Sequence, residues 1–483
     1  MHFDLTTRES YQNALNELKE YDIKNDPSTA IQLNEKEKAA ERYLVNLRDQ
    51  LLDKYKEEMF FPPSRYYYLS KDEMENTDLF KVLQKMPKGG LLHVHTSGTL
   101  DAMWIVERAI QEDKCYVYWG EDKVKQGMFQ FAYSGKQSEG YEKASVLNET
   151  IPNFKQSLYE KLCFINAQDT NTIAYWKDFE EKFDRIRSFL AYEPVYKDYY
   201  YASFKELLDD GIQHVEIRAT LFDLLQDING NPYAPDKMIE LMEQALEEAR
   251  RDFDKDLTIK LIYSGIRQFD KETVRKDLQT AYRLKKEYPT MITGYDLVGE
   301  EDGGYCTRFY LDEFIDFKNS IKDKENQLPF FFHNGESSWN HNDNLFDAIL
   351  LNSKRIGHGF NLFRYPHLKQ LVKDKDICIE ACPLSNQILG YIRDLRLHPA
   401  SSYIKEGIAV TINSDDPGMF GYKGVTPDYW VAWMAWDLNL AQLKQLVWNS
   451  ITYSTLDATE KEVAFVALDK RWNTFIEELT EKY

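Results

Sequence analysis

Short apolar runs recur along the chain from residue 89 onward, and each run ends in polar or glycine-bearing residues. Continuous apolar runs of this length, bounded by turn-forming residues, are typical of buried β-strands. Eight such runs are present, over residues 89–98, 211–220, 257–267, 292–301, 328–337, 353–362, 376–385 and 408–417. The pattern therefore predicts eight buried strands.

Segments with helical periodicity separate these runs from residue 221 onward. The clearest covers residues 236–253, where one helical face collects Met238, Ile239, Met242, Ala245, Leu246, Ala249 and Phe253. Strands that alternate with helices form parallel sheets, and eight repeats of the alternation are typical of a closed barrel. The fold class that we expect is α/β, a TIM-like (β/α)8 barrel.

Two regions depart from this alternation. Residues 1–80 are polar with helical spacing of their apolar positions, which indicates an N-terminal helical arm. About 110 residues separate the first apolar run from the second, and loops that long without structure of their own are uncommon. We therefore expect an inserted subdomain at 100–175, followed by a helix at 177–190, within a barrel that spans 81–483.

The chain carries 80 acidic and 60 basic residues, a formal net charge of −20. Such a charge repels a phosphate backbone and an anionic membrane surface, so we expect no nucleic-acid partner and no membrane partner. The first twenty residues lack an apolar signal segment, and five cysteines without Cys-x-x-Cys spacing do not indicate a disulfide framework. These features favour a cytoplasmic protein, or a secreted one if the chain start is processed.

The side chains best suited to catalysis or metal binding lie where the predicted strands end. They are His93 and His95 in the first run, His333 and Glu336 in the fifth, His358 in the sixth, and Asp415 and Asp416 in the eighth. In (β/α)8 barrels the carboxyl ends of the strands form the active-site rim. Residues two apart on a strand point to the same side, so His93 and His95 can bind one ion. A lone His-x-His pair is weak evidence for a metal site, and the prediction depends on its coincidence with the other rim residues.

Imidazole nitrogens with a carboxylate are ligands that suit zinc, and a catalytic zinc keeps one position open for water. We expect one Zn²⁺ per chain, with His93, His95, His333 and Asp415 as its ligands. A two-metal site usually needs a bridging lysine at the end of the fourth strand, and that segment, GYDLVGEE, has none.

Zinc lowers the pKa of its bound water toward about 7, which makes a nucleophile available at neutral pH. His358 is placed to hold and deprotonate that water, and Glu336 is placed to protonate a ring nitrogen of the substrate. Each assignment has a structural alternative. His358 can be a buried core histidine, Glu336 a carboxylate that orients a ligand, and Asp416 a helix N-cap before Pro417.

Six motifs in order resemble the adenosine deaminase family, and most of all its adenosine deaminase growth factor branch. They are HVH at 93–95, GYDLVGEEDGG at 294–304, FFHNGES at 331–337, RIGHGFNL at 355–362, IEACPLSNQ at 379–387 and NSDDPGMFG at 413–421. The resemblance runs from about Met86 to Tyr483. It implies hydrolytic deamination of adenosine or a related 6-aminopurine nucleoside, such as 2′-deoxyadenosine, to an inosine-type product and ammonia.

The same resemblance implies further roles. Gly299 would offer a backbone N–H to the purine, Asp416 would act in catalysis and hydrogen-bond the imidazole edge of the base, and Trp176 is a candidate substrate contact or a core aromatic. The N-terminal helices would form a homodimer, and the insertion would occupy the place of a receptor-binding subdomain.

The chain also departs from the pattern of that branch. Thr96 and Ser97 stand where family members have an aspartate that contacts the ribose, and Ile266 stands where the branch has a histidine near the sugar. Cys115 matches one half of a disulfide of the branch, but no cysteine stands at the other half. We therefore expect the deaminating residues to be intact and the sugar contacts to be altered, as a 2′-deoxy or 5′-modified nucleoside would require.

Three hypotheses follow from the sequence. The first is a purine nucleoside deaminase, which releases ammonia. The second keeps the barrel but hydrolyses an amide or ester, without ammonia. The third is a receptor-binding signalling protein with a vestigial metal site, in which the catalytic residues are dispensable.

Overall fold

A computed structural model describes residues 6–133, 135, 137–165, 172–221, 224–322, 327–339 and 341–481. Within these residues each of the eight apolar runs contains a strand. The strands are β1 (Gly89–His95), β5 (Ile212–Ala219), β6 (Thr258–Ile266), β7 (Ile292–Val298), β8 (His333–Asn334), β9 (Arg355–His358), β10 (Cys378–Ala381) and β11 (Val410–Ile412). They form two parallel sheets, in the orders β1-β5-β6-β7 and β8-β9-β10-β11.

The two sheets meet at both of their edges. At one seam the N–H of His95 donates to the carbonyl of Asp415 (3.1 Å), and the N–H of Asp415 donates to the carbonyl of His93 (3.2 Å). At the other seam the N–H of Tyr295 donates to the carbonyl of Pro329 (2.8 Å), and Phe331 donates to Tyr295 (2.9 Å). These bonds close the ring of strands, so the predicted (β/α)8 barrel is confirmed.

The fifth strand is much shorter than its apolar run. The run covers 328–337, but β8 comprises only His333 and Asn334. Pro329 has no N–H to give to a ladder, and Phe330 pairs with Tyr295 through a single bridge. Strand β8 is therefore limited to the rim, where His333 lies.

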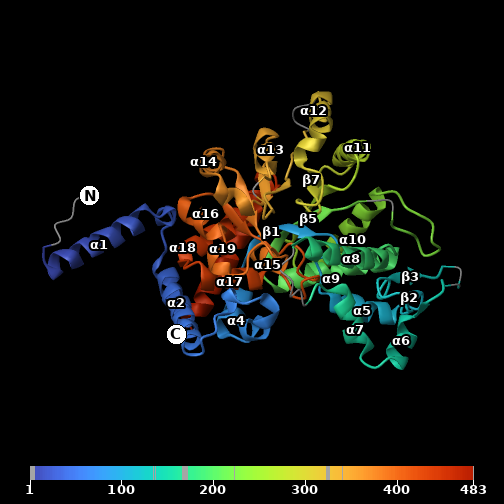
Figure 1. Ribbon diagram of the computed structural model, residues 1–483, viewed down its shortest axis with the longest axis horizontal. Coiled ribbons are helices and arrows are strands. Elements are labelled where there is room, and N and C mark those ends of the chain that lie inside the picture. The colour runs from blue at the N-terminus through green and yellow to red at the C-terminus, as the bar shows by residue number, and fades with distance from the viewer. Residues whose placement is uncertain are drawn as a thin grey trace.

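Helices surround the strands on the outside (Figure 1). The predicted helix at 236–253 is α10 (Asp236–Asp252), whose buried face includes Met238, Ile239, Met242 and Ala245. The helix expected at 177–190 begins earlier, as α8 (Thr172–Leu190). The remaining α-helices that follow α8 are α9 (Glu193–Asp209), α11 (Lys271–Glu287), α12 (Leu311–Ser320), α13 (Asn344–Leu350), α14 (Pro366–Asp374), α15 (Pro383–Ile388), α16 (Ala400–Glu406), α17 (Thr426–Ala435), α18 (Leu440–Thr452) and α19 (Ala458–Glu481).

Additional elements lie between β1 and α8, on the lower right in Figure 1. They are α5 (Ala102–Gln111), β2 (Cys115–Tyr118), β3 (Phe129–Phe131), β4 (Tyr141–Lys143), α6 (Ala144–Thr150) and α7 (Phe154–Leu162), and the three strands form an antiparallel sheet. Residues 134, 136 and 166–171 of the expected 100–175 insertion lie outside the described residues. The division into 1–80, 81–483 and 100–175 stays a prediction.

The N-terminal segment is helical over most of its described length. It forms α1 (Arg8–Asn25), α2 (Glu35–Glu57), α3 (Lys71–Glu75) and α4 (Asp78–Lys85). Helix α2 packs on the C-terminal helices, where the indole N–H of Trp472 donates to the Glu37 carboxylate (2.9 Å) and Lys444 makes an ion pair with it (2.6 Å). Helix α1 projects away from the body of the molecule (Figure 1) and buries only Ala14.

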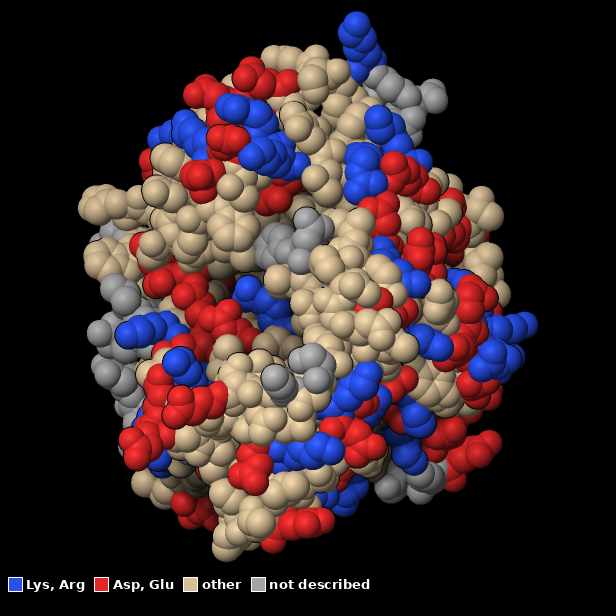
Figure 2. Space-filling view, turned by 90° about the vertical axis from the view of Figure 1, so that its right-hand side faces the viewer, with Lys and Arg blue, Asp and Glu red and all other residues tan. Residues whose placement is uncertain are grey.

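The surface drawn in Figure 2 carries charges of both signs. On the face drawn in Figure 2, basic side chains are interspersed among acidic ones, and acidic side chains border a hollow. All five cysteines are free, and Cys306 alone among them is exposed. Within the described residues, no helix combines the length and apolar character that a membrane span requires.

Candidate active site

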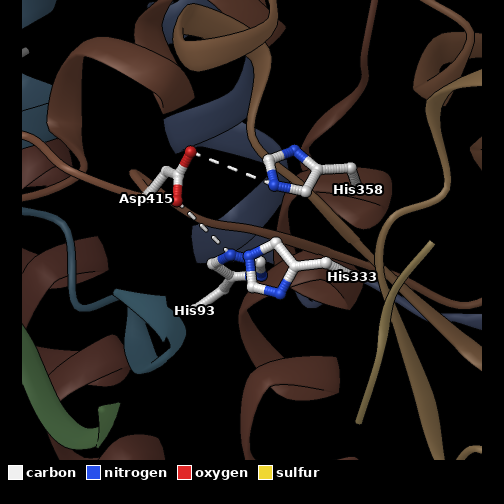
Figure 3. Close-up of side chains that lie close together, drawn as sticks. All are labelled: His93, His333, His358 and Asp415. Atoms are coloured by element: carbon white, nitrogen blue, oxygen red, sulfur yellow. Dashed lines mark ion pairs between the residues drawn. The ribbon is translucent and has the colours of Figure 1, made fainter. Parts of the chain in front are cut away.

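The predicted rim residues converge at one point of the barrel mouth. Nε2 of His95 lies 3.0 Å from Oδ1 of Asp415, and Nε2 of His93 lies 3.4 Å from the same oxygen. Nε2 of His333 lies 3.2 Å from Nε2 of His95. Figure 3 shows His93, His333, His358 and Asp415 pointing toward one another. The closed barrel thus unites side chains that are more than three hundred positions apart in the sequence.

Two of these residues have unusual backbone conformations. His358 ends β9 with φ of 59°, and Asp415 follows β11 with φ of 63°. A positive φ is rare for residues other than glycine and costs about 1–3 kcal/mol, and such conformations cluster at functional sites. Here the turn out of the strand directs each side chain toward the centre of the mouth.

A layer of buried carboxylates orients the histidines from below. Nδ1 of His93 donates to Oε2 of Glu380 (2.8 Å), and Nδ1 of His333 donates to Oδ2 of Asp296 (2.6 Å). The guanidinium of Arg218 donates to both carboxylates. Because Nδ1 carries the proton in both rings, each Nε2 presents a lone pair to the centre.

We did not identify Glu380, Asp296 or Arg218 from the sequence. Each is a charged residue inside a strand that is otherwise apolar, as in the segments IEA, YDL and EIRA. Buried charges are rare unless they are paired. A charge in the middle of a predicted core strand was therefore a usable signal.

A second chain of hydrogen bonds reaches His358. The backbone N–H of Ala400 donates to Nδ1 of His398 (3.2 Å), so the proton of the neutral His398 ring lies on Nε2. Nε2 of His398 donates to the side-chain oxygen of Asn386 (3.1 Å). The amide nitrogen of Asn386 then donates to Nδ1 of His358 (3.2 Å). Because a backbone N–H can only donate, the chain fixes the direction of every bond and leaves the His358 proton on Nε2, which faces the centre.

The donor set fits a metal ion. Nε2 of His93 is buried without a hydrogen-bond partner. Candidate ligand atoms of His93, His333 and Asp415 lie within 4.8 Å of one another, in a cluster that also contains His358. Nε2 of His95 lies 3.0 Å from Oδ1 of Asp415, whereas Nε2 of His358 carries a proton and offers no lone pair to an ion. Buried nitrogens without partners are costly unless a ligand satisfies them, and imidazole with carboxylate suits zinc.

The carboxyl groups of the site differ in their ionisation. Burial, followed by the charges of Asp415 and Glu301, raises the pKa of Glu336 well above its usual range. Burial and the neighbouring Asp415 raise the pKa of Asp416 in the same way. For Asp415 itself burial opposes ionisation, but the close imidazole nitrogens of His93 and His95 outweigh it, and its pKa is held well below the usual range. One acid thus stays ionised while two neighbours hold their protons.

His333 and His358 favour their neutral forms. Burial lowers the pKa of His333 to about 4, although Asp296 acts in the opposite direction. Burial also lowers the pKa of His358 well below its usual value. Neutral imidazoles are the forms that bind metals.

The site opens into a cavity of about 300 Å³. Its lining includes His95, His333, His358, Asp415, Asp416, Glu336, Gly299 and Trp176. Oε2 of Glu336 lies 3.5 Å from Nε2 of His358. The other carboxyl oxygen of Glu336, Oε1, is buried without a partner, and so is Oδ1 of Asp416. The indole N–H of Trp176 donates to the hydroxyl of Tyr391 (2.7 Å). Thr96, Ser97 and Ile266, which replace the family's sugar contacts, line the same cavity.

Comparison with known proteins decides the family. The profile of the adenosine deaminase family matches residues 151–470. The chain belongs to the adenosine deaminase family. It is 35% identical to adenosine deaminase 2 of Sus scrofa over 93% of this chain and 90% of that protein. Adenosine deaminase 2 of Dictyostelium discoideum is 33% identical over 93% of this chain and 84% of that protein. The family resemblance seen in the motifs is confirmed, and it makes the chain a hydrolytic deaminase.

Solved structures agree on the fold. The N6-mAMP deaminase of Arabidopsis superimposes with a TM-score of 0.59 and 16% identity, covering 81% of this chain and 99% of that one. An adenine deaminase from Arthrobacter aurescens gives a TM-score of 0.55 and 19% identity, covering 80% and 98%. An amidohydrolase from Burkholderia ambifaria, solved with bound Zn, gives 0.59 and 15%, covering 83% and 94%.

Proposed function

We propose that this member of the adenosine deaminase family deaminates 6-aminopurine nucleosides, adenosine or a relative such as 2′-deoxyadenosine, with one zinc ion per chain. The observation that supports this most is the convergence of His93, His95, His333 and Asp415 at the cavity that Glu336 and Asp416 line. These first four residues would hold the ion. A zinc ion bound there supplies Lewis acidity, which makes water a nucleophile at neutral pH.

The remaining residues handle the protons. His358 was expected to hold and deprotonate the attacking water. Because its Nε2 carries a proton, we propose that it holds the water by donating to the oxygen. Glu336, whose Oε2 lies 3.5 Å from that nitrogen, delivers its proton to the purine ring nitrogen and then, as the carboxylate that remains, takes the proton of the water. The raised pKa of Glu336 suits both transfers.

Three residues are proposed to bind the base. Gly299, which follows β7, lines the cavity, and its backbone N–H would bind the base. Asp416, whose raised pKa keeps it protonated, donates to the imidazole edge of the purine. Trp176 contributes an aromatic wall, and its bond to Tyr391 sets the position of the ring. A purine ligand agrees with the relatives and structural neighbours, which are adenosine, adenine and N6-mAMP deaminases.

We also propose a homodimer and a cytoplasmic location. The projecting helix α1 exposes Tyr11, Leu18, Tyr21 and Ile23, which a second copy can cover. Free cysteines fit a reducing compartment, and secretion after processing of the chain start is the alternative. Light scattering on the full chain and on a Leu18→Glu, Tyr21→Glu variant tests the dimer, since the variant should be monomeric.

The function is tested by ammonia release from a panel of 6-aminopurine nucleosides, bases and nucleotides with zinc-loaded protein. We expect turnover of at least one nucleoside. Glu336→Gln should reduce kcat by about 10²–10⁴ with its zinc content unchanged, while Glu406→Gln, on the exposed side of α16, should behave as the wild type. No ammonia from any compound would contradict the proposal, and wild-type turnover by Glu336→Gln would contradict the role of that residue.

A further inference from the structure

The cavity continues well beyond the candidate active centre. Glu336, His358 and Asp416 come from the half of the barrel formed by β8 to β11, whereas the rest of the cavity is lined from the side of β1, β5 and β6. The walls there come from the end of α8, the start of α9, the segment after β5 and the start of α10. The cavity therefore crosses the barrel mouth from one half to the other.

The far part of the cavity is apolar, and we call it the distal compartment. Its described walls carry Leu190, Ala191, Leu224, Leu225, Met238 and Ile266. Leu225 is 1% exposed and Met238 is 8% exposed, whereas Leu224 is 42% exposed, so the compartment is set into the fold and opens to solvent at Leu224.

Several polar groups of the lining already have partners in the protein, whereas the hydroxyl of Tyr196 is buried without one. The hydroxyl of Thr96 lies 3.3 Å from that of Thr220, and the hydroxyl of Tyr200 donates to the carbonyl of Thr96 (3.1 Å). Arg187 makes an ion pair with Asp184 at 3.1 Å. The side-chain amide of Gln268 donates to Glu180 (3.3 Å). Ser97 and the hydroxyl of Tyr196 remain in the lining as partners for the hydroxyls of a sugar ring.

The proposed function fixes which end of the substrate reaches this compartment. The amino group that leaves is on C6 of the purine and must lie at the candidate centre. The sugar is attached to N9, at the opposite end of the bicyclic ring, so it extends away from the centre. The exocyclic C5′ is the sugar carbon that projects beyond the furanose ring, and it meets the apolar walls.

We propose that the preferred substrates are 5′-deoxyadenosines that carry an apolar thioether or alkyl group at C5′. This inference rests on the proposed function and names its substrate class. Each methylene that leaves water for an apolar wall favours binding by about fourfold, and a 5′-hydroxyl in the same place loses its hydrogen bonds to water. A 5′-phosphate fits least, because Glu180 and Asp184 line the cavity and the one cationic side chain of its described lining, Arg187, is paired with Asp184.

The reaction leaves the 5′ group untouched. Water adds its oxygen to C6, and the C6–N bond breaks. One proton of the water leaves with the amino group as ammonia, and the other remains on the ring nitrogen of the product. The product is the corresponding 6-oxopurine nucleoside with the same C5′ substituent.

The test compares kcat/KM for adenosine, 5′-deoxyadenosine, 5′-deoxy-5′-methylthioadenosine and AMP on zinc-loaded enzyme. We expect the methylthio compound to exceed adenosine at least about tenfold. Met238→Gln keeps the length of the side chain and places a polar group in the distal compartment. Ile266→Thr also places a polar group there, on β6, and keeps the branch at Cβ. Both variants should lower the ratio severalfold. Met103→Gln is the matched control, because Met103 is partly buried on α5 outside the cavity, and it should leave the ratio unchanged.

The outcomes separate this inference from the function on which it rests. A ratio near or below one, with adenosine turned over well, overturns the inference and leaves the deaminase proposal standing. A high ratio that neither Met238→Gln nor Ile266→Thr lowers, in folded variants, shows that the distal compartment does not bind the 5′ group and overturns the assignment. Absence of ammonia from all four compounds overturns the deaminase proposal itself.

Discussion

Nδ1 of His93 lies 2.8 Å from Oε2 of Glu380, and both side chains are completely buried. The carboxylate fixes the ring so that Nε2 faces the proposed metal position. Partners of this kind typically affect metal affinity by about 10–100-fold. We therefore expect Glu380→Gln to weaken zinc binding by that factor, measured by competition with a chromogenic chelator, with Glu406→Gln as the control.

Glu380 also pairs with Arg218 and Arg355, so the substitution can lower stability as well. Ser385→Ala is a gentler companion, because it removes only the bond from the Ser385 hydroxyl to Oδ2 of Asp415 (2.7 Å). Zinc affinity equal to the wild type in both folded variants would show that these contacts do not support a metal.

The hydrogen bonds that connect Ala400 to His358 through His398 and Asn386 predict which ring nitrogen of His358 carries the proton. Asn386→Asp replaces an amide donor by a carboxylate that can only accept, which draws the proton of His358 to Nδ1. We expect kcat to fall by about 10²-fold or more, since a wrong tautomer disables a catalytic histidine, while zinc content is retained. Nitrogen-15 NMR of the histidines reports the tautomer directly. The exposed Asn473→Asp is the control, and an Nδ1–H signal for His358 in the wild type would refute the assignment.

Trp176 and Tyr391 are expected to act as one unit in substrate binding, because the indole donates to the Tyr391 hydroxyl at 2.7 Å. Trp176→Phe and Tyr391→Phe each remove this bond. We expect each to raise KM, and the double variant to be little worse than either single one, with a coupling of about 0.5–3 kcal/mol. Strictly additive effects on kcat/KM would indicate that the bond has no role in substrate binding.

Asp277 on α11 should make stability depend on pH. Burial raises its pKa to about 6, although a hydrogen bond from Tyr263 acts against this. The folded state therefore binds a proton more tightly than the unfolded state, so the stabilisation is complete below about pH 4 and is lost as pH rises through about 6. Urea unfolding from pH 4.5 to 7.5 should show a steeper loss of stability in the wild type than in Asp277→Asn. Asp312→Asn, at an exposed position of α12, should retain the wild-type slope, and parallel slopes for all three proteins would contradict the prediction.

The sequence was most informative where side-chain chemistry coincides with strand ends. The eight apolar runs predicted the strands, and the rim positions of His93, His333, His358 and Asp415 followed from them. The backbone turns at His358 and Asp415 could not be predicted, because a positive φ outside glycine depends on tertiary contacts. The seam bonds of Asp415 with His93 and His95 are likewise long-range pairings that no local pattern encodes.

The supporting residues were harder to find for the same reason. Asn386 was inside one of the six motifs, but its link to His398 and His358 depends on how α15 and α16 pack. The apolar character of the distal compartment comes from four separate segments, so the replacement at Ile266 alone could indicate an altered sugar site but not its shape.

The most direct test of the account is a zinc titration of the metal-free enzyme, with ammonia release from a nucleoside substrate as the readout. We expect protein stripped by a chelator to be inactive, and we expect activity to return in proportion to added zinc and to reach its maximum at one ion per chain. His333→Ala should fail to recover at the same zinc concentration. Full activity of the stripped protein, or a maximum that requires two ions per chain, would contradict a single metal centre built from His93, His95, His333 and Asp415.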